Sequence, residues 1–125
     1  MKKIINTPNA PAPIGPYNQA ILANNTLYIS GQIAIESKSG AIINDNIIEE
    51  TKQVMENLKA ILNATEMDLS HVTKCTIFIK NMNDFAEINE VYGSYFKTDA
   101  PARECVEVSR LPKDVNVEIS AIALK

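Results

Sequence analysis

The sequence predicts an α+β fold in which two helices pack on one face of a mixed six-stranded sheet. Short segments with alternating apolar and polar residues precede, separate and follow two longer segments whose apolar residues recur every three or four positions. Alternation is typical of strands, and the longer spacing is typical of helices. The resulting order is strand, strand, strand, helix, strand, helix, strand, strand. Two helices on one face of the sheet satisfy this order best.

The composition limits the class of protein. With 125 residues, 46% of them hydrophobic, the chain suits one domain spanning residues 1–125 and is too short for two ordinary domains. Twelve Lys and Arg against fifteen Asp and Glu give a net charge of -3, which argues against a nucleic-acid partner, because phosphate binding needs clustered positive charge. The N-terminus has no apolar leader and no stretch is long enough to span a membrane, so we expect a cytoplasmic protein.

The first part of the chain predicts three strands. A strand over residues 2–5 precedes a proline-rich loop that ends at Pro16, and strands over residues 17–22 and 26–33 flank an Asn-Asn turn. Gly31 interrupts the third strand. An interior glycine usually marks a bulge, and less often a close approach of the backbone to a ligand.

Two amphipathic segments predict the helices. The first has an apolar stripe that we assign to the core, and Asn46 with Glu49 fits a variant of the capping box. A strand over residues 72–80 should turn Cys75 and its alternate neighbours toward the helices. Asn83 is expected to cap the second helix. The stripes comprise Ile47, Thr51, Val54, Met55, Leu58, Ile61, Leu62 and Thr65 in the first helix, and Phe85, Ile88, Val91, Tyr92, Tyr95 and Phe96 in the second.

The last two strands predict a polar face. Residues 103–109 and 114–120 both alternate, and a hairpin loop over residues 110–113 would place Cys105 opposite Glu118 and Arg103 one pair further along. The three side chains would then share a face that either meets water, as one side of an antiparallel sheet often does, or binds a small anion. Cysteines in strands most often act as small hydrophobes. Two cysteines and one histidine at no metal-ligand spacing argue against a metal site.

The face of the sheet without helices should be a subunit contact. It would combine Arg103, Cys105 and Glu118 with apolar side chains such as Tyr28 and Phe78. Such a mixture suits an interface better than water, so we expect a homo-oligomer with a pocket at or near its interface.

Several short motifs resemble those of the reactive-intermediate deaminase (Rid, or YjgF) family over the whole chain. The resemblance implies a chorismate-mutase-like subunit, a homotrimer with pockets between neighbours, and no cofactor. The implied reaction is hydrolysis of 2-iminobutanoate and 2-iminopropanoate, the latter formed from 2-aminoacrylate, to 2-oxo acids and ammonia. One departure is Glu104, where the family usually has a small residue. The motifs are Ile14-Gly15-Pro16-Tyr17, Ser30-Gly31-Gln32, Asn83-Asp84-Phe85, Pro101-Ala102-Arg103, Cys105-Val106-Glu107-Val108, Leu111-Pro112-Lys113-Asp114-Val115 and Val117-Glu118-Ile119.

The resemblance also implies a role for each candidate site residue. A guanidinium offers a carboxylate a planar bidentate partner, so Arg103 would anchor the substrate. Glu118 would deprotonate the attacking water and return the proton to the leaving ammonia. Cys105 would line the pocket mainly through its backbone. The remaining candidates are Tyr17 as a hydroxyl and a wall, Ser30 and Gly31 as the floor, and Phe85 and Asn89 from the adjacent subunit.

Two other functions remain open at this point. Members of the family have been described as endoribonucleases and inhibitors of translation, but the acidic balance and the single histidine argue against a dedicated ribonuclease. A non-catalytic binder of small metabolites would keep Arg103 but would not need Glu118. The presence of both residues favours the deaminase.

Overall fold

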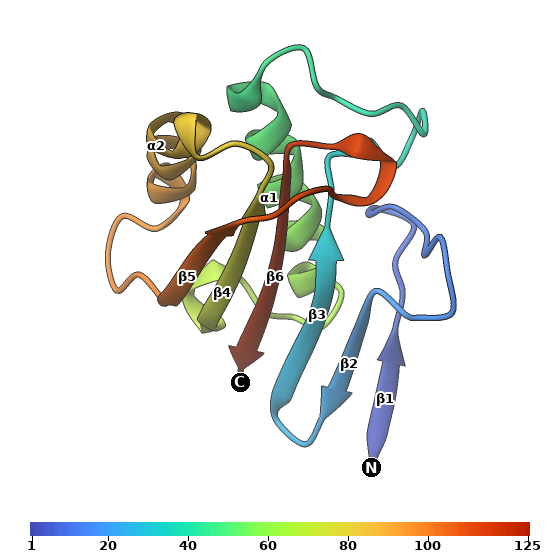
Figure 1. The fold of residues 1–125 in the computed structure, drawn as a ribbon. Coiled ribbons are helices and arrows are strands. Elements are labelled where there is room, and N and C mark those ends of the chain that lie inside the picture. Colours follow the sequence, from blue (N-terminus) through green and yellow to red (C-terminus); the bar gives the residue numbers. More distant parts are fainter.

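A computed structural model describes residues 1–125 (Figure 1). Eight long elements are joined by loops and by three short 3₁₀ turns, η1 to η3. The strands are β1 (Lys2–Ile5), β2 (Ala20–Ala23), β3 (Thr26–Gln32), β4 (Val72–Ile79), β5 (Ala102–Glu107) and β6 (Val117–Leu124); the helices are α1 (Ile47–Asn63) and α2 (Phe85–Tyr95); and the turns are Leu69–His71, Met82–Asp84 and Pro112–Asp114.

The six strands form one mixed sheet in the order β1-β2-β3-β6-β4-β5. All neighbours are antiparallel except β4 and β5, which are parallel. Both helices lie behind the sheet in Figure 1, and the opposite face is open. The predicted arrangement of two helices on a mixed six-stranded sheet is therefore confirmed.

Helix α1 forms the centre of the core, as its apolar stripe predicts. Met55, Ile61 and Leu62 are fully buried and belong to a cluster of 22 buried residues. The Asn46 side chain accepts a hydrogen bond from the Glu49 backbone N–H at 2.9 Å, so the predicted cap is confirmed.

The start of α2 differs from the prediction. Asn83 does not cap the helix, because a 3₁₀ turn intervenes between strand and helix. Its N-cap is Asp84, which makes no side-chain cap hydrogen bond, while Asn81 caps the preceding turn by accepting from the Asn83 N–H at 2.9 Å. Asn81, which follows β4, therefore acts as a cap, whereas Asn83 was expected to do so.

The predicted hairpin between the last two strands is wrong. β4 lies between them, pairing with β5 in parallel and with β6 in antiparallel register. The connection has a 3₁₀ turn and left-handed backbone at Lys113 (φ 58°) and Asp114 (φ 55°), and it carries the chain past β4 to the centre of the sheet (Figure 1). β6 consequently begins at Val117 rather than at Asp114.

This topology separates the three residues that the hairpin placed together. Arg103 pairs with Cys75, whose side chain is buried beneath the helices, so Arg103 and Cys105 face the helix side. Glu118 alternates with the buried Val117 and Ile119 of β6, so it faces the open side. A shared face within one chain is therefore excluded, and the expectation that Arg103 and Cys105 lie on the face without helices is wrong.

The open face is partly apolar. Tyr28, Val106 and Leu124 are 50%, 44% and 51% exposed there, and an ion pair joins Lys74 to Glu104 at 3.4 Å. Glu104 thus points away from the helices, which is opposite to the expectation, because that expectation placed Arg103 on the open face and therefore Glu104 on the helix side. None of the helices is both long and apolar enough to cross a membrane.

Candidate functional site

The open face carries one group of candidate site residues around Glu118. The pairing of β3 with β6 is interrupted between Ile29 and Gln32, so the predicted bulge at Gly31 is confirmed. A Cβ at Gly31 would lie 2.7 Å from the Glu118 carboxyl carbon, which is closer than non-bonded atoms approach. A larger residue here would displace the Glu118 side chain, which lies against the backbone of the bulge.

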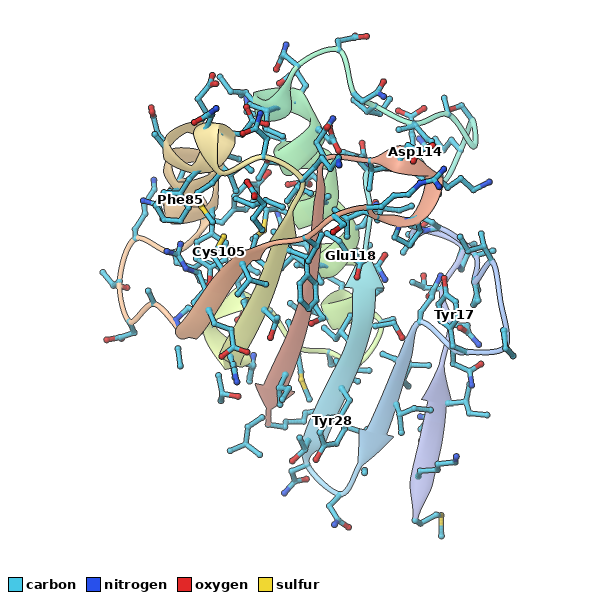
Figure 2. All side chains as sticks on the ribbon, viewed as in Figure 1. Tyr17, Tyr28, Phe85, Cys105, Asp114 and Glu118 are labelled. Carbon is cyan, nitrogen blue, oxygen red and sulfur yellow. The ribbon has the colours of Figure 1, made fainter.

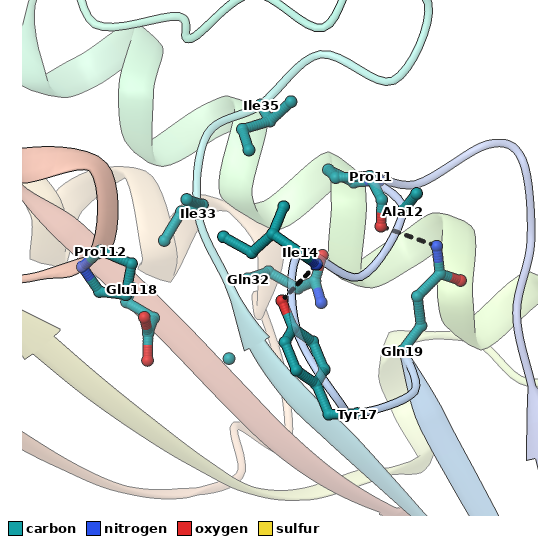
Figure 3. A pocket seen from close by; sticks show the side chains of 11 residues that line it. Pro11, Ala12, Ile14, Tyr17, Gln19, Gln32, Ile33, Ile35, Pro112 and Glu118 are labelled. Carbon is teal, nitrogen blue, oxygen red and sulfur yellow. Dashed lines mark hydrogen bonds between the residues drawn. The ribbon is translucent and has the colours of Figure 1, made fainter.

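A pocket opens beside Glu118 (Figure 3). Tyr17 forms one wall, and its hydroxyl accepts a hydrogen bond from the Ile14 N–H at 3.3 Å. Pro112, from the connection before β6, forms another. The lining residues are Pro11, Ala12, Ile14, Tyr17, Gln19, Gly31, Gln32, Ile33, Ile35, Pro112 and Glu118. The structure therefore brings Tyr17, Gly31 and Glu118 together at one pocket.

Ser30 is the exception among the residues expected to form the floor. It does not line this pocket, and its hydroxyl donates a 2.6 Å hydrogen bond to the Asn18 carbonyl. Its backbone N–H donates to the Gln19 carbonyl at 2.9 Å. Within one chain, Ser30 fastens the bulge to the loop before β2.

Gln19 holds the proline-rich loop over this pocket, and the sequence analysis did not identify it. Its side chain is 2% exposed and donates to the carbonyls of Thr7, Ala10 and Pro11 at 3.0, 3.2 and 2.8 Å. Its side-chain oxygen accepts from the Thr7 N–H at 2.7 Å. Prolines cannot donate backbone hydrogen bonds, so a buried amide takes over the ordering of this loop. No periodicity or motif marks such a residue.

Glu118 has the electrostatic character of a base. Burial raises the pKa of its carboxyl above the usual value, and no cation lies close enough to oppose this shift. The carboxylate form is thus more basic than that of an exposed glutamate. A base of this kind can accept a proton from a water molecule held in the pocket.

The helix side carries the second group, around Arg103. Its Nη1 donates to the Asn89 side-chain oxygen at 2.6 Å, and its Cζ lies 5.7 Å from the centre of the Phe85 ring. The structure brings these three residues together within one chain, whereas the resemblance implied that Phe85 and Asn89 meet the arginine from a neighbour. Phe85 and Asn89 are four residues apart and lie on one face of α2. This spacing could have predicted that both residues contact the same strand.

Cys105 lies beside this group but has the properties of a structural thiol. Its side chain is partly buried and packs against the core. Burial raises the pKa of the thiol, and Arg103 opposes that shift only in part. The thiol is therefore protonated at neutral pH and is a poor nucleophile. Cys75, the other cysteine, is buried, as expected for a small hydrophobe.

The two groups lie on opposite faces of the sheet. In Figure 2, Phe85 and Cys105 lie on the side of α2 and β5, whereas Glu118 and Tyr17 lie toward β6 and the N-terminal loop. We call them the helix-side half (Phe85, Asn89, Arg103 and Cys105) and the open-face half (Tyr17, Gly31 and Glu118). A site that uses both Arg103 and Glu118 needs two copies of the chain.

Comparisons with known proteins give the family. The family described as "Endoribonuclease L-PSP" matches residues 7–125. The chain belongs to this family. A RutC family protein of Pyrococcus horikoshii is 58% identical to this chain over 125 residues, and the match covers 100% of this chain and 99% of the relative.

Two further relatives connect the Endoribonuclease L-PSP family with the Rid proteins. A 2-iminobutanoate/2-iminopropanoate deaminase of Mus musculus is 43% identical over 125 residues, covering 100% of this chain and 93% of that protein. A protein of the conserved Rid family from Yersinia pestis, of unknown function, has the same fold with a TM-score of 0.97. It is 45% identical, and the match covers 100% of both chains. The resemblance found in the sequence is thus confirmed.

Proposed function

We propose that the protein hydrolyses 2-iminobutanoate and 2-iminopropanoate to 2-oxo acids and ammonia, at a site completed by two copies of the chain. The observation that carries the proposal is the pair of halves. The helix-side half presents a guanidinium suited to a carboxylate, and the open-face half presents a partly buried base. An α-imino acid has both a carboxylate and an electrophilic carbon. The mouse deaminase supports the choice of substrate.

A cyclic trimer would bring the halves together. In a ring, each subunit contributes one surface to the neighbour before it and a different surface to the neighbour after it, so two unlike halves meet at every contact. The exposed apolar side chains of the open face favour such a contact. The number of subunits, three, rests on the resemblance to the Rid family.

The reaction follows from the two halves. Arg103 binds the substrate carboxylate, which places the protonated imine carbon beside Glu118. Glu118 removes a proton from water as the oxygen adds to that carbon, forming a carbinolamine. The same proton then passes to the nitrogen. The carbon–nitrogen bond breaks and ammonia leaves, while the hydroxyl passes its proton to Glu118, which gives the 2-oxo acid; Glu118 then releases that proton to solvent or to the ammonia. Each step is a proton transfer, an addition or an elimination, so no oxidant is consumed.

The test uses imine generated in place. A serine or threonine dehydratase forms the enamine and imine, and release of 2-oxo acid is followed with wild type, Arg103→Ala and Glu118→Gln. We expect wild type to accelerate release, and loss of the charged contact to reduce substrate capture by about one to two decades in Arg103→Ala. If the wild-type protein does not accelerate the release of 2-oxo acid, the proposal is wrong.

The two alternatives have distinct outcomes. Binding of 2-oxo acids that depends on Arg103, without catalysis, would identify a metabolite-binding protein. RNA cleavage that survives purification and depends on Arg103 or Glu118 would identify a ribonuclease, although the net charge of -3 argues against one. The cytoplasmic location stays a prediction from the sequence.

A further inference from the structure

Three residues of α2 form a holder for Arg103. Phe85, Asn89 and Tyr92 are spaced four and three positions apart, so they share one stripe of the helix. The stripe faces β5, where Arg103 pairs with Cys75 of β4. The holder thus joins a helix to an edge strand.

The contacts fix the guanidinium from several directions. Its Cζ lies 5.1 Å from the centre of the Tyr92 ring and 5.7 Å from that of Phe85, within the range of cation–π attraction. Asn89 accepts from Nη1 at 2.6 Å. A guanidinium has five N–H donors, so several remain free for a ligand. Arg103 makes no ion pair within the chain that would compete for them.

Tyr92 is distinguished by a buried ring beside Arg103. The residue is 4% exposed, and its hydroxyl lies beside the Cys75 thiol without a hydrogen bond of ordinary geometry. The ring packs against Phe96, with centroids 4.9 Å apart, and presents a face to Arg103. The ring is therefore the part of Tyr92 that contacts the Arg103 guanidinium.

We infer that Tyr92, together with Phe85 and Asn89, is a positioning residue that orders the Arg103 guanidinium for a carboxylate ligand. On this account Phe85 and Asn89 act through Arg103 and do not themselves bind the substrate. Ordering the guanidinium before the ligand arrives removes an entropic cost from binding. The inference rests on the proposed function only for the identity of the ligand, an α-imino or 2-oxo acid.

The test compares Tyr92→Leu with Tyr92→Phe, which keeps the ring and removes only the hydroxyl. Rotation of the Arg103 guanidinium is measured by NMR on its Nε–H group, without ligand. Rotation should be faster in Tyr92→Leu and unchanged in Tyr92→Phe. KM for the imine should rise about three- to tenfold in Tyr92→Leu with kcat nearly unchanged, because a cation–π contact of this kind has that magnitude.

A second measurement keeps the inference falsifiable. In an Arg103→Lys background, Tyr92→Leu should change KM much less than in wild type, since its effect passes through the guanidinium. Asn89→Ala, at a more exposed contact, replaces Tyr92→Leu if the latter fails to fold. If the Arg103 guanidinium rotates at the wild-type rate in both Tyr92→Leu and Asn89→Ala, the inference is wrong, even if wild type is an active deaminase. If rotation is faster in Tyr92→Leu but wild type shows no deamination, the inference about the holder stands and only the proposed function is refuted.

Discussion

The two halves of the candidate site are built in opposite ways. The helix-side half is complete within one chain: a permanent cation is held by two aromatic rings and an amide. The open-face half is a carboxyl group that burial has made more basic, lying against a glycine without a cation beside it. The comparison suggests that one half is organised to bind and the other to react. In the proposed assembly, association of two subunits places the binding group of one chain next to the reacting group of the other.

Mixing two inactive variants should give the largest effect. Arg103→Ala and Glu118→Gln each lack one half, so each should be almost inactive alone. In randomly mixed trimers, about a quarter of the sites would combine an intact Arg103 with an intact Glu118 from the neighbour. Activity after co-refolding should therefore recover to about that share of wild type. Recovery is measured by 2-oxo acid release, and none at any mixing ratio would place both residues in one chain.

Gly31→Ala should damage the open-face half alone. The backbone at Gly31 is not left-handed, so only the collision with the flexible Glu118 side chain matters. We expect Glu118 to be displaced and kcat to fall about tenfold or more, as for loss of a positioned base, with little change in thermal unfolding. Gly93→Ala is the matched control, because a Cβ there meets nothing within 4 Å. Equal activity of the two variants would contradict the proposed position of Glu118.

The pH dependence should sharpen the contrast between the halves. The base must be ionised, so activity should rise with pH through the Glu118 pKa, which burial raises within one chain and which the neighbour's Arg103 would lower in the assembly. The raised pKa also means that the folded chain binds a proton more tightly than the unfolded chain. The stability this provides is present at low pH and is lost as pH rises through the folded pKa. Glu118→Gln should therefore gain stability relative to wild type as the pH rises above the pKa of an ordinary glutamate, as measured by urea unfolding; a difference that does not change with pH would be inconsistent with the raised pKa.

Cys105→Ser should give the smallest effect. The thiol is protonated at neutral pH, so replacing it removes no nucleophile. We expect kcat/KM to stay within about twofold of wild type, because free cysteines in strands act mainly as small apolar groups. A loss as large as that of Glu118→Gln, in a folded variant, would assign Cys105 a chemical role that its surroundings do not favour.

Local patterns in the sequence predicted what depends on nearby residues. The core stripe of α1, the Asn46 cap and the bulge at Gly31 all follow from spacing along one element. Alternation also separated Glu104 from Arg103 correctly. Such features depend on backbone geometry over a few residues, and the chain shows them directly.

The site required knowledge that alternation does not contain. Alternation tells which residues of one strand share a face, but it does not tell which strand lies beside it. Inserting β4 between β5 and β6 moved Arg103 and Glu118 to opposite faces, although each strand kept its pattern. The role of Gln19 depends on long-range contacts to loop carbonyls, which leave no periodic signal.

The two outer strands of the sheet discourage a different kind of association. β1 presents exposed Lys2 and Lys3, and β5 presents exposed Glu104 and Glu107. Charges on outer strands oppose the addition of another strand, which is a common route to aggregation. Copies of this chain are therefore steered away from open-ended ribbons and toward contacts through faces and loops, which can close on themselves. The same charges that keep the sheet finite would also protect newly made chains at high concentration while they search for their partners.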